Sequence, residues 1–170
     1  HFIAKDIMAY FRLATGARHR QDFLQIMNRP KRYLGRDSVA GAKVSFEDMR
    51  KFYCDKDWMI DRIDQFEWDV KMLLIFPLMQ ILMSGNAAIQ YIRKRIGYDD
   101  FLKEYAFTHQ INRSDLNEVL AEIEEAAKAF SSVEEWFAHV EEYTETLKVK
   151  EKERNRPRPG VRLMTIHASK

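Results

Sequence analysis

The chain has 170 residues, which fits one domain, and 46% of them are hydrophobic, enough to form a core. Six glycines and four prolines amount to roughly half the average usage. Turns are therefore few, which favours long helices and argues against an all-β sandwich or barrel. The single cysteine, Cys54, excludes an internal disulfide and a Cys-based metal site. We expect it to be a packed apolar group in a cytoplasmic protein.

The net charge of +2 hides an uneven distribution. Residues 1–56 hold twelve Lys/Arg against six Asp/Glu, and residues 147–170 hold eight against two. Residues 115–146, in contrast, hold one Lys/Arg against ten Asp/Glu. This asymmetry favours a nucleic-acid partner. The plainer alternative, that the charges lie on solvated helix faces, stays open at this point.

The apolar spacing predicts a succession of helices. The expected ranges are 3–15, 20–28, 45–53, 57–84, 87–96, 98–107, 114–130 and 132–148. Ser38, Ser45, Asn86, Ser114 and Ser132 are the expected caps, and Gly16 and Gly97 the expected stops. The long helix 57–84 should bury an apolar face and should kink or split at Pro77. That face comprises Trp58, Ile60, Ile63, Phe66, Val70, Leu73 and Leu74.

The last part of the chain differs from the helical part. Residues 149–160 are charged, contain prolines and lack aromatics, so they predict a linker. Residues 161–167 form an apolar run typical of a buried strand. One strand cannot form a sheet, so its partners must lie elsewhere. Because the chain begins at His1 without Met and stops soon after this strand, we expect it to be a segment of a longer protein.

Several kinds of site are not indicated by the sequence. It contains no G-x-x-x-x-G-K-[ST] phosphate-binding loop, no G-x-G-x-x-G motif and no G-x-S-x-G nucleophile motif. Its histidines lack the spacing of metal ligands. The longest apolar stretch, 72–83, is shorter than the roughly 20 residues of a membrane span. We therefore assign no catalytic residue, no metal ligand and no membrane partner.

Two segments have the residue types that bind phosphates. The loop 29–37 places Arg29, Lys31, Arg32 and Arg36 around a turn that contains Gly35. Backbone N–H groups and cationic side chains in such a turn make phosphate contacts that are independent of base sequence. Thr165 and His167 lie at the end of the expected strand, where ligands bind in α/β proteins. The alternatives are an ordinary solvated loop and a strand that simply ends in a polar turn.

The two ends of the chain resemble UvrD/PcrA/Rep-type superfamily 1 DNA helicases. Residues 161–170, "VRLMTIHASK", are similar to the family's V-x-L-M-T-x-H-x-A/S-K segment. Residues 5–13, "KDIMAYFRL", resemble its K-D-x-x-A-Y-L-R-L segment. Residues 22–39 resemble its F-x-R-I-I-N-x-P-x-R-G-I-G-x-x-[ST] segment, although Tyr33 and Leu34 replace Gly and Ile. Between 57 and 148 the resemblance is only a string of helices of suitable length.

The resemblance implies a particular fold and division of the chain. In that family these motifs bracket the helical 2B subdomain, an insertion in the second RecA-like domain. The implied fold is mainly α, an irregular helical bundle with one C-terminal strand from the RecA-like domain. Residues 1–148 would form the 2B-like subdomain, with 1–15 at the edge of the RecA-like domain. Residues 149–160 would be the linker and 161–170 the truncated strand.

The same resemblance implies a function. The segment would be a DNA-binding regulatory subdomain, inactive alone, in a helicase or helicase–nuclease that hydrolyses ATP with Mg²⁺. It would bind DNA at a junction of duplex and single strand, and the parent protein would have protein partners. The implied DNA-binding residues are Arg29, Lys31, Arg32, Gly35 and Arg36 in the turn that grips duplex DNA, and Thr165 and His167 on the single-strand track.

A helical protein-interaction module is the alternative from a different class. The acidic segment 114–148 carries Trp136, Phe137 and Tyr143, which would hold a protein partner. Packing of these aromatics into the core is the simpler interpretation of their spacing. Charge location separates the two functions, because only a DNA-binding module should need the cations of the loop 29–37.

Overall fold

The computed structural model describes residues 2–79, 85–130 and 135–142. The chain divides into two units, His1–Phe137 and Ala138–Lys170, and only residues 138–142 of the second unit are described. The described part is mainly helical and contains no strand beyond an isolated bridge between His19 and Lys43. The expected linker 149–160 and strand 161–167 lie outside the described residues.

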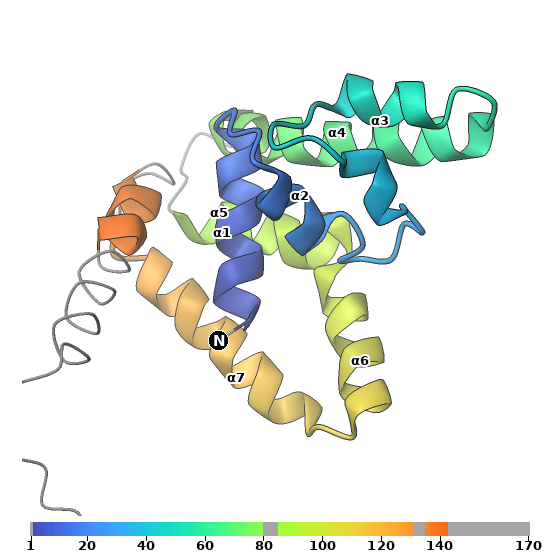
Figure 1. Cartoon of the computed structure of the whole chain (residues 1–170). Coiled ribbons are helices and arrows are strands. Elements are labelled where there is room, and N and C mark those ends of the chain that lie inside the picture. The colour runs from blue at the N-terminus through green and yellow to red at the C-terminus, as the bar shows by residue number, and fades with distance from the viewer. Residues whose placement is uncertain (1, 80–84, 131–134, 143–170) are drawn as a thin grey trace, which may run out of the picture. The chain divides into compact units, whose positions relative to one another are not determined.

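The first helix, α1 (Phe2–Ala14), forms the centre of the first unit and packs against α2, α4 and α7 (Figure 1). The other elements are α2 (Arg20–Ile26), η1 (Arg36–Val39), α3 (Phe46–Phe52), α4 (Asp57–Met79), α5 (Gly85–Tyr91), η2 (Ile92–Ile96), α6 (Tyr98–His109) and α7 (Arg113–Ala127). Residues 135–142 are also helical. No helix among these residues has both the length and the apolar character needed to cross a membrane.

Several of the expected helix boundaries are confirmed. Ser45 and Asp48 form a reciprocal capping box at the start of α3, which satisfies backbone donors that the helix itself leaves unpaired. Gly16 and Gly97 follow helices with φ of +97° and +89°, a region that costs glycine little. The predicted helices 3–15 and 98–107 correspond to α1 and α6, within two residues at either end.

Other expected boundaries are corrected. Asn112, not Ser114, caps α7, because the Asn112 side chain accepts a hydrogen bond from the Ser114 amide. Ser38 lies inside the short 3-10 helix η1, and its hydroxyl donates to the Gly35 carbonyl. Asn86 lies in the first turn of α5, and its side-chain oxygen makes no hydrogen bond with described residues. Helix α4 continues through Pro77 to Met79, so of the kink or split expected there the split does not occur.

Aromatic side chains join α2, α3 and α4. Phe23, Phe46 and Phe66 meet edge to face, with ring centroids 5.2 to 6.3 Å apart. Such tilted contacts are the favoured geometry for aromatic pairs. Trp136 packs in the same manner against Phe11 of α1, at 5.3 Å, and is buried. For Trp136 the core interpretation is therefore confirmed, while Tyr143 lies outside the described residues.

Candidate nucleic-acid interface

The loop between α2 and η1 is organised by one side chain, that of Asn28. Its Oδ1 atom accepts hydrogen bonds from the amides of Arg32 (3.2 Å) and Leu34 (3.0 Å). Its Nδ2 atom donates to the Leu34 carbonyl at 2.8 Å. Three hydrogen bonds from one amide side chain fix the path of the backbone from 28 to 34 without a regular element. The side chains of residues 29–34 therefore start from a backbone with a fixed conformation.

Tyr33 stands at the tip of this loop with φ of +59°, the left-handed region that β-carbon sterics disfavour. The helicase segment that residues 22–39 resemble has glycine at this position. Glycine adopts a positive φ at little cost, whereas tyrosine does not. Tyr33 is 61% exposed. The structure thus keeps a bulky aromatic side chain at a backbone position that favours glycine.

Gly35 has a different environment from the one expected of an open phosphate-binding turn. Its N–H donates a 2.7 Å hydrogen bond to the hydroxyl of Tyr53. A β-carbon at position 35 would lie 3.1 Å from the same hydroxyl. The Gly35 amide is therefore used inside the protein and is not available to a phosphate.

Arg32 is buried, which corrects the expectation that all four cations of the loop face a ligand. Its side chain pairs with Asp69 at 3.3 Å and lies over the Phe66 ring at 4.5 Å. Its nitrogen atoms also donate to the Tyr10 hydroxyl and to three backbone carbonyls of residues 26, 27 and 30. Charge counting alone does not show which arginine is internal. Arg32 holds the loop onto α1 and α4 rather than extending into solvent.

Arg29 has a mixed role. Its guanidinium pairs with the fully buried carboxylate of Asp6 at 2.6 Å, and about a third of the side chain remains exposed. The guanidinium carbon also lies 5.9 Å from the ring centroid of Phe2 and 5.7 Å from that of Phe101. Its charge is partly offset by Asp6, so it contributes less to the surface potential than a free cation would.

Lys31 and Arg36 are the predicted cations that lie on the surface. Lys31 is exposed and pairs with the exposed Glu104 at 3.7 Å, a contact that water and salt weaken strongly. Arg36 is exposed at the start of η1. The predicted residues Thr165 and His167 lie outside the described residues.

Arg62 and Trp58 lie next to Tyr33 and enlarge the surface of the loop, and no sequence pattern predicts a site role for these three residues. The Arg62 guanidinium carbon lies 4.9 Å from the ring centroid of Tyr33 and 5.0 Å from that of Trp58. Trp58 was expected in the apolar face of its helix, but it is 56% exposed. In the first turn of α4 it is the neighbouring Met59, not Trp58, that is buried.

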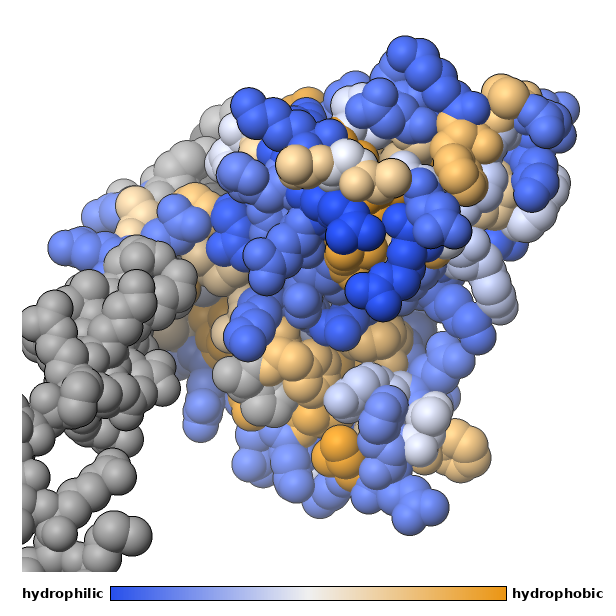
Figure 2. Space-filling model, in the orientation of Figure 1, coloured by the Kyte–Doolittle hydropathy of each residue, from blue (hydrophilic) through white to orange (hydrophobic). Residues whose placement is uncertain are grey.

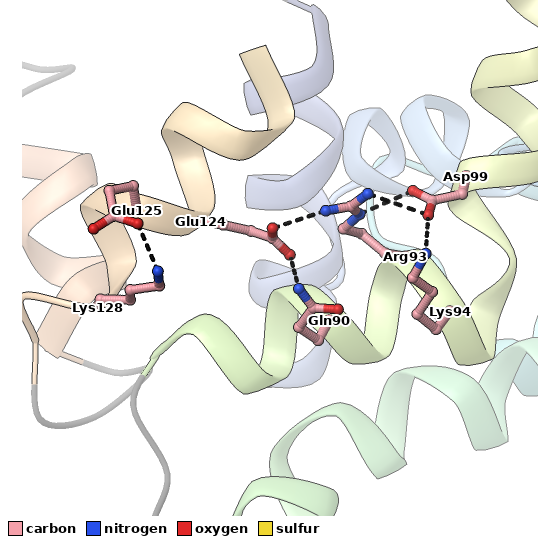
Figure 3. A network of polar contacts seen from close by, with 7 residues as sticks. All are labelled: Gln90, Arg93, Lys94, Asp99, Glu124, Glu125 and Lys128. Carbon is pink, nitrogen blue, oxygen red and sulfur yellow. Dashed lines mark hydrogen bonds and ion pairs between the residues drawn. The ribbon is translucent and has the colours of Figure 1, made fainter. Parts of the chain in front are cut away.

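The acidic helix α7 is tied into the fold by one of its glutamates. Glu124 accepts hydrogen bonds from Arg93 (2.7 Å) and Gln90 (2.5 Å), and Arg93 also pairs with Asp99 at 3.0 Å (Figure 3). Glu124 is therefore a buried structural group. The remaining acids of α7 are exposed, namely Asp115, Glu118, Glu122 and Glu125, so the helix still presents a negative face.

Cys54 is exposed, which corrects the expectation of a packed apolar group. Its thiol donates a 2.7 Å hydrogen bond to the Asp55 carboxylate, and this contact raises the pKa of the thiol. A raised pKa disfavours the reactive thiolate. Among the described residues, no group of three or more His, Cys, Asp or Glu side chains is placed to hold a metal ion.

Comparisons with models of protein families, with curated proteins and with solved structures gave no match to this chain. The class shown is therefore that of a mainly helical protein with a well-defined basic loop. A more specific assignment rests on the sequence motifs and on the geometry of that loop.

Proposed function

We propose that this chain is a DNA-binding regulatory subdomain of an ATP-dependent DNA helicase, equivalent to the 2B insertion. The observation that carries the proposal is the loop 29–37, in which the residues that resemble the family motif occupy a fixed backbone. Asn28 holds residues 28–34 of the loop by three hydrogen bonds, and Lys31 and Arg36 are exposed in the loop. Cations on a fixed backbone bind phosphates with less loss of loop freedom than cations on a mobile one.

The chemistry of this loop suits the phosphates of DNA rather than its base sequence. Lys31, Arg36 and the exposed part of Arg29 would contact backbone oxygens, which are alike at every step of a duplex. The helicase motor itself would need ATP and Mg²⁺, which we assign to the rest of the parent protein. Residues 161–170, with Thr165 and His167, would belong to its RecA-like domain and meet the single strand.

Fluorescence anisotropy with a duplex that carries a single-stranded tail tests this function. The binding constant should fall steeply with salt, because each neutralised phosphate releases counterions. The double variant Lys31→Ala/Arg36→Ala should reduce the slope of log K against log salt by about 2. A matched control removes the same charge from exposed sites on α1 and α3, Lys5→Ala/Lys51→Ala, and should change that slope little.

Arg32 is left unchanged in this test because its removal would disturb the fold. Absence of binding at low salt would contradict autonomous DNA binding. It would direct attention to a protein partner for the exposed acidic face of α7. Equal effects of the two double variants would show that the attraction is general and not centred on the loop.

A further inference from the structure

Two large aromatic side chains stand exposed next to the basic loop, and both contact the same guanidinium. Tyr33 is 61% exposed and Trp58 is 56% exposed. The rings lie 4.9 Å and 5.0 Å from the Arg62 guanidinium carbon, and Lys31 lies 4.9 Å from the Tyr33 ring. We name Lys31, Tyr33, Trp58 and Arg62 the aromatic–cation cluster. It joins the loop to the first turns of α4, 25 residues further along the chain.

The cluster is held in place before any ligand arrives. Arg62 donates a 3.1 Å hydrogen bond to the carbonyl of Arg32, and Arg32 is itself buried against Asp69 and Phe66. The guanidinium that both rings contact is therefore anchored to the interior. Tyr33 and Trp58 each remain more than half exposed in spite of these contacts. Fixed, exposed rings lose little conformational freedom when a flat partner stacks on them.

Exposed aromatics alone do not select a partner, but their neighbours favour one. Lys31 and Arg62 lie against the rings, and Arg36 is exposed three residues after Tyr33 in the same loop, so the positive charge there complements a polyanion. Aromatic rings interleaved with cations bind single-stranded nucleic acid, with bases on the rings and phosphates on the cations. In a duplex the faces of the bases are already stacked on one another. Only unpaired bases can therefore use the rings.

We propose that the aromatic–cation cluster binds unpaired nucleotides, with bases stacking on Trp58 and Tyr33 and phosphates contacting Lys31, Arg36 and Arg62. The choice of nucleic acid as the partner rests on the proposed DNA-binding function. The cluster adds that this subdomain also contacts the unpaired strand at a junction, besides the duplex. Because stacking is sequence-tolerant, the binding has little preference among bases.

The test compares a labelled 15-nucleotide oligothymidine with a blunt duplex of equal length, using the full 170-residue chain and anisotropy at low salt. Trp58→Ala and Tyr33→Ala should each weaken binding of the single strand by about five-fold or more, the usual effect of losing one stacked base. Their effect on the blunt duplex should stay below about two-fold. Trp68→Ala is the matched control, since Trp68 is on the same helix and 59% exposed.

Tryptophan fluorescence gives a second readout, and its Trp68→Phe variant leaves the cluster itself intact. Oligothymidine should quench the Trp68→Phe variant, which retains Trp58, and should quench the Trp58→Phe variant much less. Equal quenching of the two variants, or equal losses for Trp58→Ala and Trp68→Ala, overturns the proposal. If duplex binding still depends on Lys31 and Arg36 in that case, the proposed DNA-binding function survives without the cluster. If neither nucleic acid binds, both proposals fail together.

Discussion

The hydroxyl of Tyr98 on α6 donates a 2.6 Å hydrogen bond to the carboxylate of Asp6 on α1. Both residues are fully buried. Asp6 also pairs with Arg29 and accepts a hydrogen bond from Gln25, so one carboxylate joins the first helix, the basic loop and α6. A buried charge is tolerated only with such partners. The position of the basic loop thus depends on an internal acid that lies outside it.

This acid should make stability depend on pH. Burial raises the pKa of Asp6 above its ordinary value of 3.8, although Tyr98, Gln25 and Arg29 oppose that shift. The folded state then holds more protons than the unfolded state between 3.8 and the raised value. The free energy of unfolding must fall as pH rises through that interval, and this contribution is constant above it. Burial also raises the pKa of Asp69, which acts in the same direction.

Asp6→Asn should therefore flatten the dependence of stability on pH. Urea unfolding at several values between about pH 4 and pH 7 measures it, and the quantity to compare is the slope rather than the absolute stability. Asp61→Asn, at an exposed position on α4, is the control and should preserve the slope of the unmodified chain. An unchanged slope in Asp6→Asn would show that Asp6 does not titrate differently in the two states.

Removal of the side-chain charge should lower the stability strongly at Arg32 and hardly at all at Arg36. Arg32→Ala leaves the carboxylate of Asp69 buried without its cation, and breaking a buried pair in this way costs about 3–5 kcal/mol. Arg36→Ala should change the free energy of unfolding by less than about 0.5 kcal/mol, since Arg36 is exposed. Urea unfolding at neutral pH separates the two. Similar losses for both variants would contradict a structural role specific to Arg32.

The cap of α7 gives a third prediction. Asn112→Ala removes the side-chain acceptor for the Ser114 amide and should destabilise the protein by about 1 kcal/mol. Ser114→Ala should have a much smaller effect, because the side chain of Ser114 is not the cap. Thermal or urea unfolding of both variants measures the difference. A larger loss for Ser114→Ala would restore the boundary that the sequence alone predicts.

Local signals predicted most of the helices, whereas the site depended on contacts between distant segments. Ser45, Gly16 and Gly97 act on their own neighbours, so their sequence context was sufficient. Arg32 and Arg36 look alike in sequence, and only the packing of α4 against the loop buries one of them. The packing of α4 against the loop also brings Trp58 and Arg62 next to Tyr33, and no local sequence signal predicts this contact. Even a local signal is ambiguous where two residues of types that favour helix caps, Asn112 and Ser114, stand close together, and only Asn112 is the cap.

Tyr33 allows the backbone of the loop to be tested directly. Its φ of +59° is costly for any residue with a β-carbon and inexpensive for glycine. Tyr33→Gly and Tyr33→Ala both lose the ring contacts with Lys31 and Arg62, so a comparison of the two isolates the backbone. We expect the glycine variant to be more stable than the alanine variant by about 1 kcal/mol.

The opposite order is expected two residues earlier, which provides the control. Lys31 is exposed in the same loop and lacks a positive φ. Lys31→Ala should therefore be more stable than Lys31→Gly by about 0.5–1 kcal/mol. This difference is the ordinary cost of the greater conformational freedom of glycine in the unfolded chain. Urea unfolding of the four variants is the measurement. An alanine variant at position 33 that matched or exceeded the glycine variant would show that the left-handed conformation is not maintained. The Asn28 hydrogen bonds would then not fix the loop as strongly as its geometry indicates.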